Sequence, residues 1–156
     1  MNIQTQNPSN QTKAVQLNWS ESEDLTLVVT PENEDRFTIR MKKAIELLQR
    51  NNNDGEFQRQ FDLLHKTLIN WLKDHDVRGA FLTIRDGSLA FLVVRQSVEF
   101  DDDFEDALSE LQFAVNTDSD LDEVPLQVVG LPCVDDAAVD SFLDRRFSIK
   151  YVHVSS

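Results

Sequence analysis

Three residues in the second half of the chain, Glu99, Cys133 and His153, have side chains that could act together in chemistry. Cys133 directly precedes a helix expected to begin at Asp135, and a helix N-terminus stabilises a thiolate through its dipole and free N–H groups. A neighbouring imidazole can accept the thiol proton, as in thiol enzymes. Glu99 and Cys133 follow expected strands, and His153 is near the end of the last one; ligands collect at the carboxyl ends of parallel strands. This pattern favours a pocket near Cys133 for a small ligand, a thiol-dependent enzyme or a sensor.

The surroundings of Cys133 argue against catalysis there. No signature motif flanks this cysteine, and the acidic residues around it disfavour a thiolate. A single free cysteine is commonly a small buried hydrophobic residue. We therefore treat the pocket at Glu99, Cys133 and His153 as the alternative hypothesis and expect no catalytic residues.

The acidic run from Asp118 to Glu123 places carboxylates at alternate positions, as a calcium loop does. Its register does not fit such a loop. Counted from Asp118, Glu123 stands where the loop needs glycine, and Val129 stands where a bidentate glutamate would close the cage. The triplet 101–103 is more simply a helix-capping cluster, because adjacent helical residues point in different directions.

Neither zinc nor a phosphate-bearing cofactor is indicated by the remaining residues. The histidines, His65, His75 and His153, are far apart, and none has a second His or Cys at ligand spacing. His65 neighbours an apolar helical stripe, which favours a hydrogen-bonded structural role. The chain has only four glycines and no glycine-rich phosphate loop. The sequence therefore predicts no metal and no cofactor.

Negative charge is the most prominent feature of the composition. Fifteen Asp and Glu residues, and no Lys, Arg or His, lie between Arg95 and Arg145. Residues 1–78 hold 10 basic and 12 acidic residues, whereas residues 79–156 hold 5 and 16, which gives net charges of −2 and −11. Such a field repels nucleic-acid phosphates and anionic membranes. It is compatible with a basic protein partner.

The preferred functional hypothesis is a non-catalytic protein-interaction module that binds a basic protein surface through residues 99–123, with complementary charge steering the encounter. An adaptor, an inhibitor or immunity-type protein, a secretion-type chaperone and a mimic of nucleic-acid charge all fit this description. The carboxylates expected to contact the partner are Asp101, Asp102, Asp103, Glu105, Asp106, Asp118, Asp120, Asp122 and Glu123.

A homodimer is the other assembly that the charge pattern allows. The first expected helix has a basic outer side, which is available to meet the acidic half of a second copy. Its basic residues are Arg36, Arg40, Lys42 and Lys43.

The compartment expected from the sequence is the cytoplasm. Residues 1–13 lack the basic start and apolar stretch of a signal peptide. The longest apolar run, 89–94, is too short to cross a bilayer. One cysteine cannot form an internal disulfide, which agrees with a reducing environment.

The expected domain organisation is a flexible polar tail over residues 1–20 followed by a single α/β domain over residues 21–156. Trp19, at the end of the tail, is expected to dock on the domain. Residues 25–29 read as an edge strand. Thr30 and Pro31 are expected to open a helix that ends at 51–53, and Asp54 to cap a second helix with the strongest apolar stripe in the chain.

The remaining elements define the fold class. The dipeptide Asp86-Gly87 predicts a type I′ turn, and therefore a β-hairpin, between strands 79–85 and 88–96. A helix over 102–115, a strand over 124–129, a short helix from Asp135 and a strand over 147–154 follow. We expect an α/β fold with a mixed sheet of about four to five strands, a β-hairpin followed by βαβαβ with three parallel strands, and an N-terminal helical hairpin packed on it.

Overall fold

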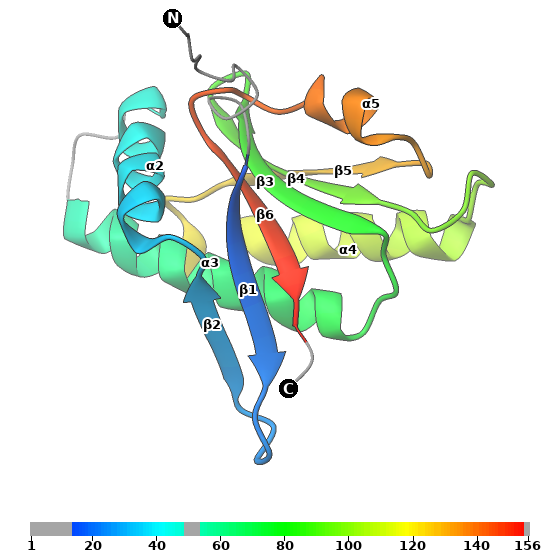
Figure 1. Ribbon diagram of the computed structural model, residues 1–156, viewed down its shortest axis with the longest axis horizontal. Helices are drawn as coiled ribbons and strands as arrows, with labels where there is room; N and C mark the ends of the chain where they lie inside the picture. Colours follow the sequence, from blue (N-terminus) through cyan, green and yellow to red (C-terminus); the bar gives the residue numbers. More distant parts are fainter. Residues whose placement is uncertain (1–13, 49–53, 155–156) are drawn as a thin grey trace, which may run out of the picture.

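The computed structural model describes residues 14–48 and 54–154, which form one mixed six-stranded sheet with four helices (Figure 1). The strand order is β2-β1-β6-β3-β4-β5. The strands are β1 (Val15–Glu21), β2 (Leu27–Pro31), β3 (Gly79–Arg85), β4 (Ser88–Val94), β5 (Leu126–Leu131) and β6 (Ser148–His153). The helices are α2 (Glu34–Leu47), α3 (Asp54–Lys73), α4 (Asp102–Asn116) and α5 (Asp136–Asp140), and a 3₁₀ turn, η1, covers Ser119–Leu121.

Strand β1 corrects the expected domain boundary. Residues 15–20, assigned to the flexible tail from sequence, belong to a strand that pairs with both β2 and β6. The side chains of Val15, Leu17 and Trp19 point into the core, and the polar residues between them point the other way. This period of two is the signature of a half-buried strand. Residues 1–13 of the expected tail lie outside the described residues.

The last three strands run parallel to one another, as expected, but they are not all neighbours in the sheet. Strand β5 lies parallel beside β4, as expected. Strand β6 has the same direction, because it is antiparallel to β3, but it lies between β3 and β1. In that position Ile149 and Tyr151 become buried in the main core. The sheet thus has six strands where four to five were expected, and the strand that was not expected is β1.

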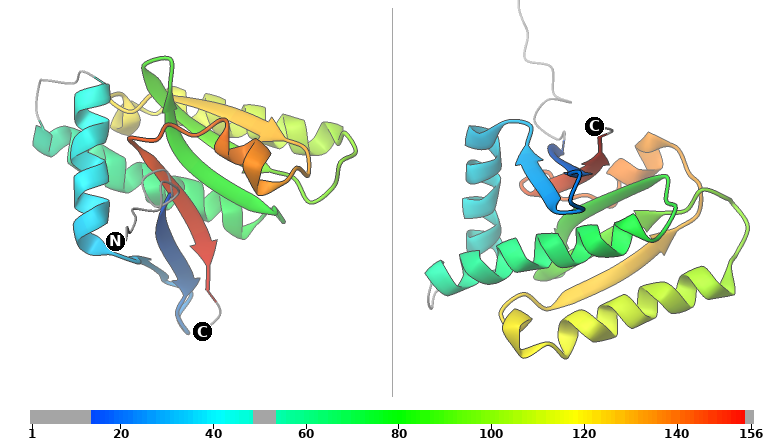
Figure 2. Two further views of the ribbon diagram at one scale, coloured as in Figure 1. Left: turned by 45° about the horizontal axis from the view of Figure 1, so that its top comes forward. Right: turned by 90° about the horizontal axis from the view of Figure 1, so that it is seen from below.

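The N-terminal helices do not form the expected antiparallel hairpin. Helix α3 runs along one face of the sheet, and α2 crosses its direction steeply at the edge near β1 and β2 (Figures 1 and 2). The expected helix start is also wrong, because Thr30 and Pro31 end β2 and Asn33 caps α2 by accepting a 3.0 Å hydrogen bond from Arg36 N. Proline is tolerated in an edge strand, where a missing N–H costs least.

The expected tight hairpin is confirmed. Strands β3 and β4 pair in register on either side of Asp86-Gly87, and both turn residues have positive φ, 54° and 78°. The edge position expected for the strand near residues 25–29 is likewise confirmed by β2, the outermost strand on its side. The hairpin turn depends on short-range sequence pattern alone.

Two apolar clusters hold the layers together. The main core joins one face of the sheet to α2, α3 and α4, and its centre is the α3 stripe of Phe57, Phe61, Leu64, Leu68 and Leu72. The smaller cluster lies on the opposite face, where α5 covers the ends of β4 and β5. No helix in the described ranges combines the length and apolar character needed to cross a membrane.

The sheet divides at its centre. The ladder between β3 and β6 joins only residues 81–83 to residues 148–150. Beyond Lys150 the β2-β1-β6 ribbon swings away from the β3-β4-β5 ribbon, as Figure 1 shows. Tyr151, Val152 and His153 therefore have no register partner on β3, and an opening forms between this part of β6 and the start of β3.

Candidate ligand-binding site

The opening in the sheet contains a cavity of about 780 Å³, which we call the wedge pocket. Its walls come from the ends of β1 and β6, the last turn of α3, the loop over residues 74–78, and the start of β3. The cavity has the size typical of small-molecule sites in proteins. It lies beside the C-terminal half of β6, where that strand separates from β3, and its lining residues from β1 and β6 lie within those strands.

Two aromatic pairs line or border the wedge pocket. The rings of Trp19 and His153 are stacked with centroids 4.2 Å apart, because parallel pairing places these residues side by side on β1 and β6. Trp19 is buried, whereas His153 is exposed towards the pocket. At the end of α3, Trp71 stacks on His75 at 3.9 Å, and His75 also lines the pocket. The site thus offers flat surfaces for a planar ligand.

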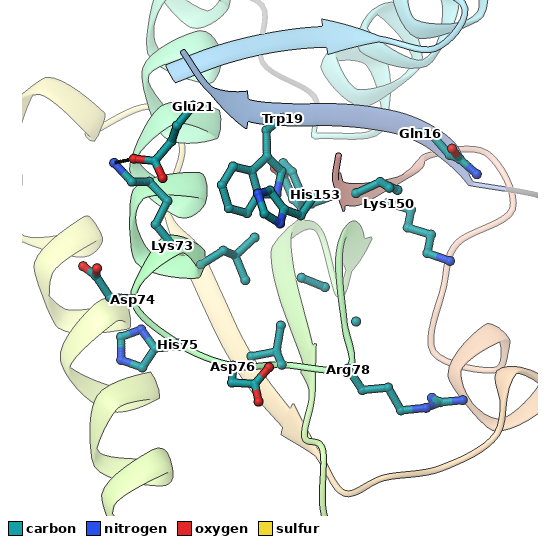
Figure 3. Close-up of a pocket in the computed structure, with 16 residues that line it drawn as sticks. Gln16, Trp19, Glu21, Lys73, Asp74, His75, Asp76, Arg78, Lys150 and His153 are labelled. Carbon is teal, nitrogen blue, oxygen red and sulfur yellow. Dashed lines mark ion pairs between the residues drawn. The ribbon is translucent and has the colours of Figure 1, made fainter. Parts of the chain in front are cut away.

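The charged side chains around the pocket are arranged asymmetrically (Figure 3). On one side Lys73 pairs with Glu21 at 3.0 Å. On the other side Lys150 and Arg78 extend in the same general direction. The Nζ atom of Lys150 lies 5.8 Å from the ring centroid of Phe81, a cation–π contact.

Tyr151, at the buried side of the wedge pocket, belongs to a neutral hydrogen-bonded pair. Tyr151 lines the pocket, and its phenolic oxygen lies 2.8 Å from Nδ1 of His65 on α3. Burial lowers the pKa of His65 to about 3 and raises the pKa of Tyr151 above its usual value, because each charged form would lose its hydration. Both groups are neutral near pH 7. His65 therefore has the hydrogen-bonded structural role that its apolar neighbourhood predicted.

The three residues of the expected Cys133 pocket occupy two places. His153 lines the wedge pocket, whereas Glu99 and Cys133 do not. The latter two share the loop region beyond β4 and β5, where Cys133 N donates to Ser97 O at 3.1 Å and Glu99 N donates to Ser97 Oγ at 3.0 Å. Cys133 is a partly exposed free thiol.

Sequence reasoning missed the principal residue of the wedge pocket, Trp19. The expectation that it docks on its own domain agrees with its burial, but the prediction did not place it in a strand. The alternation of Val15, Leu17 and Trp19 was the available signal. The opening between β6 and β3 had no such signal, because it depends on which strands become neighbours.

The nine carboxylates expected to bind a partner fall into two groups at opposite ends of α4. A helix of 15 residues is about 22 Å long, so the groups do not form one continuous surface. In the first group Asp101 caps α4 by accepting a hydrogen bond from Phe104 N, and Glu105 pairs with the buried Arg95 at 3.2 Å. The exposed members of this group that neither cap the helix nor pair with Arg95 are Asp102, Asp103 and Asp106.

The second acidic group is partly committed to structure. Asp118 accepts a 2.8 Å hydrogen bond from Asp120 N and caps η1. Asp122 accepts a 2.8 Å hydrogen bond from Gln60 Nε2, and Gln60 Oε1 accepts one from Glu123 N at 2.7 Å. These contacts fasten the turn after α4 to α3.

The first acidic group adjoins two exposed apolar side chains. Val98 is 71% exposed and Phe100 is 70% exposed, in the loop that leads into α4. They alternate with Glu99 and Asp101.

The basic side expected on the first helix is partly engaged within the chain. Arg40 Nη1 donates to Arg145 O at 2.8 Å, and Lys43 pairs with Glu46 at 3.4 Å. The homodimer hypothesis, which used these side chains, stays a prediction.

Within residues 14–48 and 54–154 no group of three or more His, Cys, Asp and Glu side chains is arranged to hold a metal ion. No family model, curated protein or solved structure matches the chain.

Proposed function

We propose that this protein binds a small molecule in the wedge pocket. The observation that carries the proposal is the cavity of about 780 Å³ at the point where the sheet divides, between the C-terminal half of β6 and the start of β3. A divided sheet leaves backbone and side chains of several elements facing one space, and this is how open α/β sheets form binding crevices.

The residues that line the pocket favour ligand binding over catalysis. It combines the stacked pair Trp19 and His153 with charged side chains from three elements. Among the described residues that line it there is no Ser, Thr or Cys. Tyr151 and His65, the titratable pair at its buried side, are neutral and bonded to each other. These groups supply flat surfaces, charges and a rigid wall, which are the components of a binding site.

Native mass spectrometry tests the proposal even while the ligand is unidentified. Protein purified from its own source under non-denaturing conditions is expected to retain a small-molecule adduct that denaturation releases. The Val152→Trp variant, which places an indole at the pocket wall, is expected to lose the adduct. The control is Val28→Trp on the edge strand β2, where the side chain is already 46% exposed and lies outside the pocket lining. An adduct of equal intensity in both variants would contradict the wedge pocket as its site.

Protein binding is a second candidate function, and the exposed Val98 and Phe100 favour it. Two apolar side chains beside Asp102 and Asp103 would complement a partner surface that has an apolar depression with a basic rim. This proposal narrows the expected interface from residues 99–123 to the loop before α4 and its first turn. The carboxylates of the second group then serve mainly to fasten η1.

A paired pull-down from the lysate of the source organism tests the second candidate. A direct partner is expected to be retained at low salt, lost at high salt and lost from the Phe100→Ser variant. Phe113→Ser is the matched control, because Phe113 is also 71% exposed but lies towards the other end of α4. Equal loss from both variants would indicate non-specific apolar adhesion and would count against this candidate.

A further inference from the structure

We infer that the ligand of the wedge pocket is a short peptide in extended conformation, held by main-chain hydrogen bonds to the part of β6 that has no partner on β3. This inference rests on the proposed function, because it names the class of molecule that the same pocket takes. It depends on which backbone groups of β6 face the opening and on what surrounds them.

The backbone of His153 faces the wedge pocket and not β1. Val154 N donates to Trp19 O at 2.9 Å, and Trp19 is the register partner of His153 in the parallel ladder between β1 and β6. Along a strand, the N–H and C=O groups of successive residues point alternately to the two sides of the strand in the plane of the sheet. Because the N–H of Val154 points to β1, the backbone groups of His153 point the other way, towards β3.

On this side of β6 the ladder has already ended. Its last register pair is Phe81 with Lys150, and the pair that would come next, Ala80 with Tyr151, is not formed. Neither ladder of β6 gives the N–H and C=O of His153 a partner among the described residues. A strand edge with unpaired N–H and C=O groups is a template for a further strand. The end of β6 is such an edge, and it lies inside a cavity.

The length of the wedge pocket along β6 suits a peptide of two or three residues. Four consecutive residues of β6, 150–153, line the pocket, and the start of β3 and the loop over 74–78 form the wall across from them. A strand rises about 3.3 Å per residue, so this stretch of β6 is about 10 Å long. A peptide antiparallel to β6 would occupy the place that β3 leaves. Its residue opposite His153 can donate to the C=O of His153 and accept from its N–H.

Side-chain alternation determines what the peptide meets on each face of the sheet. The His153 ring, stacked on Trp19 and exposed, lies on the face of the main core, whereas Lys150 points to the opposite face and contacts the Phe81 ring there. Residues directly opposite each other in a sheet present their side chains on the same face, and aromatic pairs at such positions are favourable. We therefore expect an aromatic residue of the peptide opposite His153.

Charge gives no comparable preference for a ligand. Three cations and three carboxylates line the wedge pocket, so its formal net charge is zero. The unpaired backbone groups of β6 require a ligand that offers both a donor and an acceptor at strand spacing, and a peptide bond chain offers both at every residue. An uncharged peptide with blocked ends is therefore the appropriate probe.

The test compares N-acetyl-glycyl-phenylalanyl-glycinamide with its depsipeptide, in which an ester oxygen replaces the N–H of the phenylalanine. Each probe is titrated into isotopically labelled protein and followed in NMR spectra. The peptide is expected to shift the signals of residues 150–153 and the Trp19 indole, and to slow solvent exchange of the His153 amide. The Val154 amide, already bonded to Trp19 O, is the internal control. The depsipeptide is expected to bind about tenfold more weakly, because the C=O of His153 then has no donor.

Two substitutions of His153 separate the backbone contact from the ring contact. His153→Ala and His153→Pro both remove the imidazole, but only proline also removes the N–H that faces the pocket. This N–H takes no part in the ladder with β1, so proline is compatible with the strand at this position. His153→Pro is expected to bind the peptide about tenfold more weakly than His153→Ala does. Urea denaturation of both variants checks that each is folded.

The outcomes separate this inference from the proposed function. Equal affinity for the peptide and the depsipeptide, or equal binding of the peptide by folded His153→Ala and His153→Pro, would overturn the peptide inference and leave a ligand pocket in place. The adduct retained in native mass spectra is expected to yield amino-acid fragments, and an adduct without amino acids would overturn the inference in the same way. Absence of any adduct, together with the failure of both probes to shift a pocket signal, would count against the proposed function itself.

Discussion

The Nδ1 atom of His65 and the phenolic oxygen of Tyr151 lie 2.8 Å apart in the interior, although 86 positions separate them in the chain. The contact joins α3 to β6 at the buried side of the wedge pocket. The other ring nitrogen of His65, Nε2, has no hydrogen-bond partner among the described residues. The imidazole also contacts the Phe37 and Phe61 rings, so a protonated His65 would not be hydrated.

This environment predicts that the protein loses stability in mild acid. Burial lowers the folded-state pKa of His65 from 6.5 to about 3, so between these values the unfolded chain binds a proton that the folded protein does not. The free energy of unfolding therefore falls as pH is lowered from about 6.5 towards 3, by roughly 2 kcal/mol between pH 7 and pH 5 from this residue alone. Urea denaturation at the two pH values measures the change.

The His65→Gln variant isolates the contribution of His65, since glutamine does not titrate. The loss of stability between pH 7 and pH 5 is expected to be smaller in this variant than in the wild type. Leu64→Val on the same helix is the control, because it weakens the core without removing a titrating group and should lower stability equally at both pH values. An unchanged pH dependence in His65→Gln would contradict the assignment.

Gly130 in β5 is required by close packing against α4. A Cβ atom at this position would lie 2.6 Å from Cδ1 of Leu108 and 3.1 Å from Oε2 of Glu105. Glu105 is held by its ion pair with the buried Arg95, so it cannot move away freely. Gly130→Ala is therefore expected to lower the free energy of unfolding by about 2 kcal/mol, as overpacking does.

Gly79→Ala provides the matched control for Gly130→Ala. Gly79 is also a strand glycine, but its nearest contact would be an ordinary one, 3.4 Å to the Phe81 side chain. Chemical denaturation of both variants decides the matter. Equal stabilities would show that α4 shifts to admit a methyl group, contrary to the prediction.

The free edge of β5 is covered by amide side chains from α4. Asn116 Oδ1 accepts a hydrogen bond from Leu126 N, and Asn116 Nδ2 donates one to Leu126 O, both at 2.8 Å. One turn earlier in the helix, Gln112 Oε1 accepts from Val128 N at 2.8 Å. These side chains pair with the strand in the way that a seventh strand would, and so they block edge-to-edge association.

Removal of this cover is expected to affect both stability and self-association. Asn116→Ala leaves the N–H and C=O groups of Leu126 unpaired and is expected to lower the free energy of unfolding by about 1–3 kcal/mol. Size-exclusion chromatography at increasing concentration is expected to show association through the exposed edge. Glu110→Ala, at an exposed position of the same helix, is the control. A monomeric Asn116→Ala variant with wild-type stability would contradict the role of the amide.

The features predicted correctly from sequence are those that depend on neighbours in the chain. The turn at Asp86-Gly87 and the α3 stripe around Phe61 follow from local preference and periodicity. The position of β6 does not, because the antiparallel register of Leu82 with Ile149 is set by tertiary packing. The wedge pocket depends on that register, so His153 is the one residue of its lining that the sequence predicts for a site.

The carboxylates illustrate the same limit. Their number is evident in the sequence, but the division of tasks between them appears only when their partners are known. Glu105 neutralises the buried Arg95, and Asp122 holds Gln60. A charge count assigns all of them to a surface, whereas the contacts leave fewer for a partner.

The last prediction concerns Asp101 and Asp103, which belong to the same acidic triplet but have different roles. Asp101 caps α4 through a 3.2 Å hydrogen bond from Phe104 N, whereas Asp103 is exposed in the first turn. Asp101→Ala is expected to lower the free energy of unfolding by about 1 kcal/mol, and Asp101→Ser to restore it because serine also caps. Asp103→Asn is expected to change it by less than about 0.5 kcal/mol.

Urea denaturation of these three variants separates folding from recognition at this end of α4. If Asp101→Ala and Asp103→Asn prove equally stable, the capping assignment is wrong. If the capping assignment holds, tests of partner binding should use Asp101→Ser and not Asp101→Ala. Serine removes the charge but keeps the helix cap, so a loss of binding then results from the lost charge and not from fraying of α4. Comparison of partner binding by the wild type with binding by Asp102→Asn and Asp103→Asn then measures the charge interaction directly.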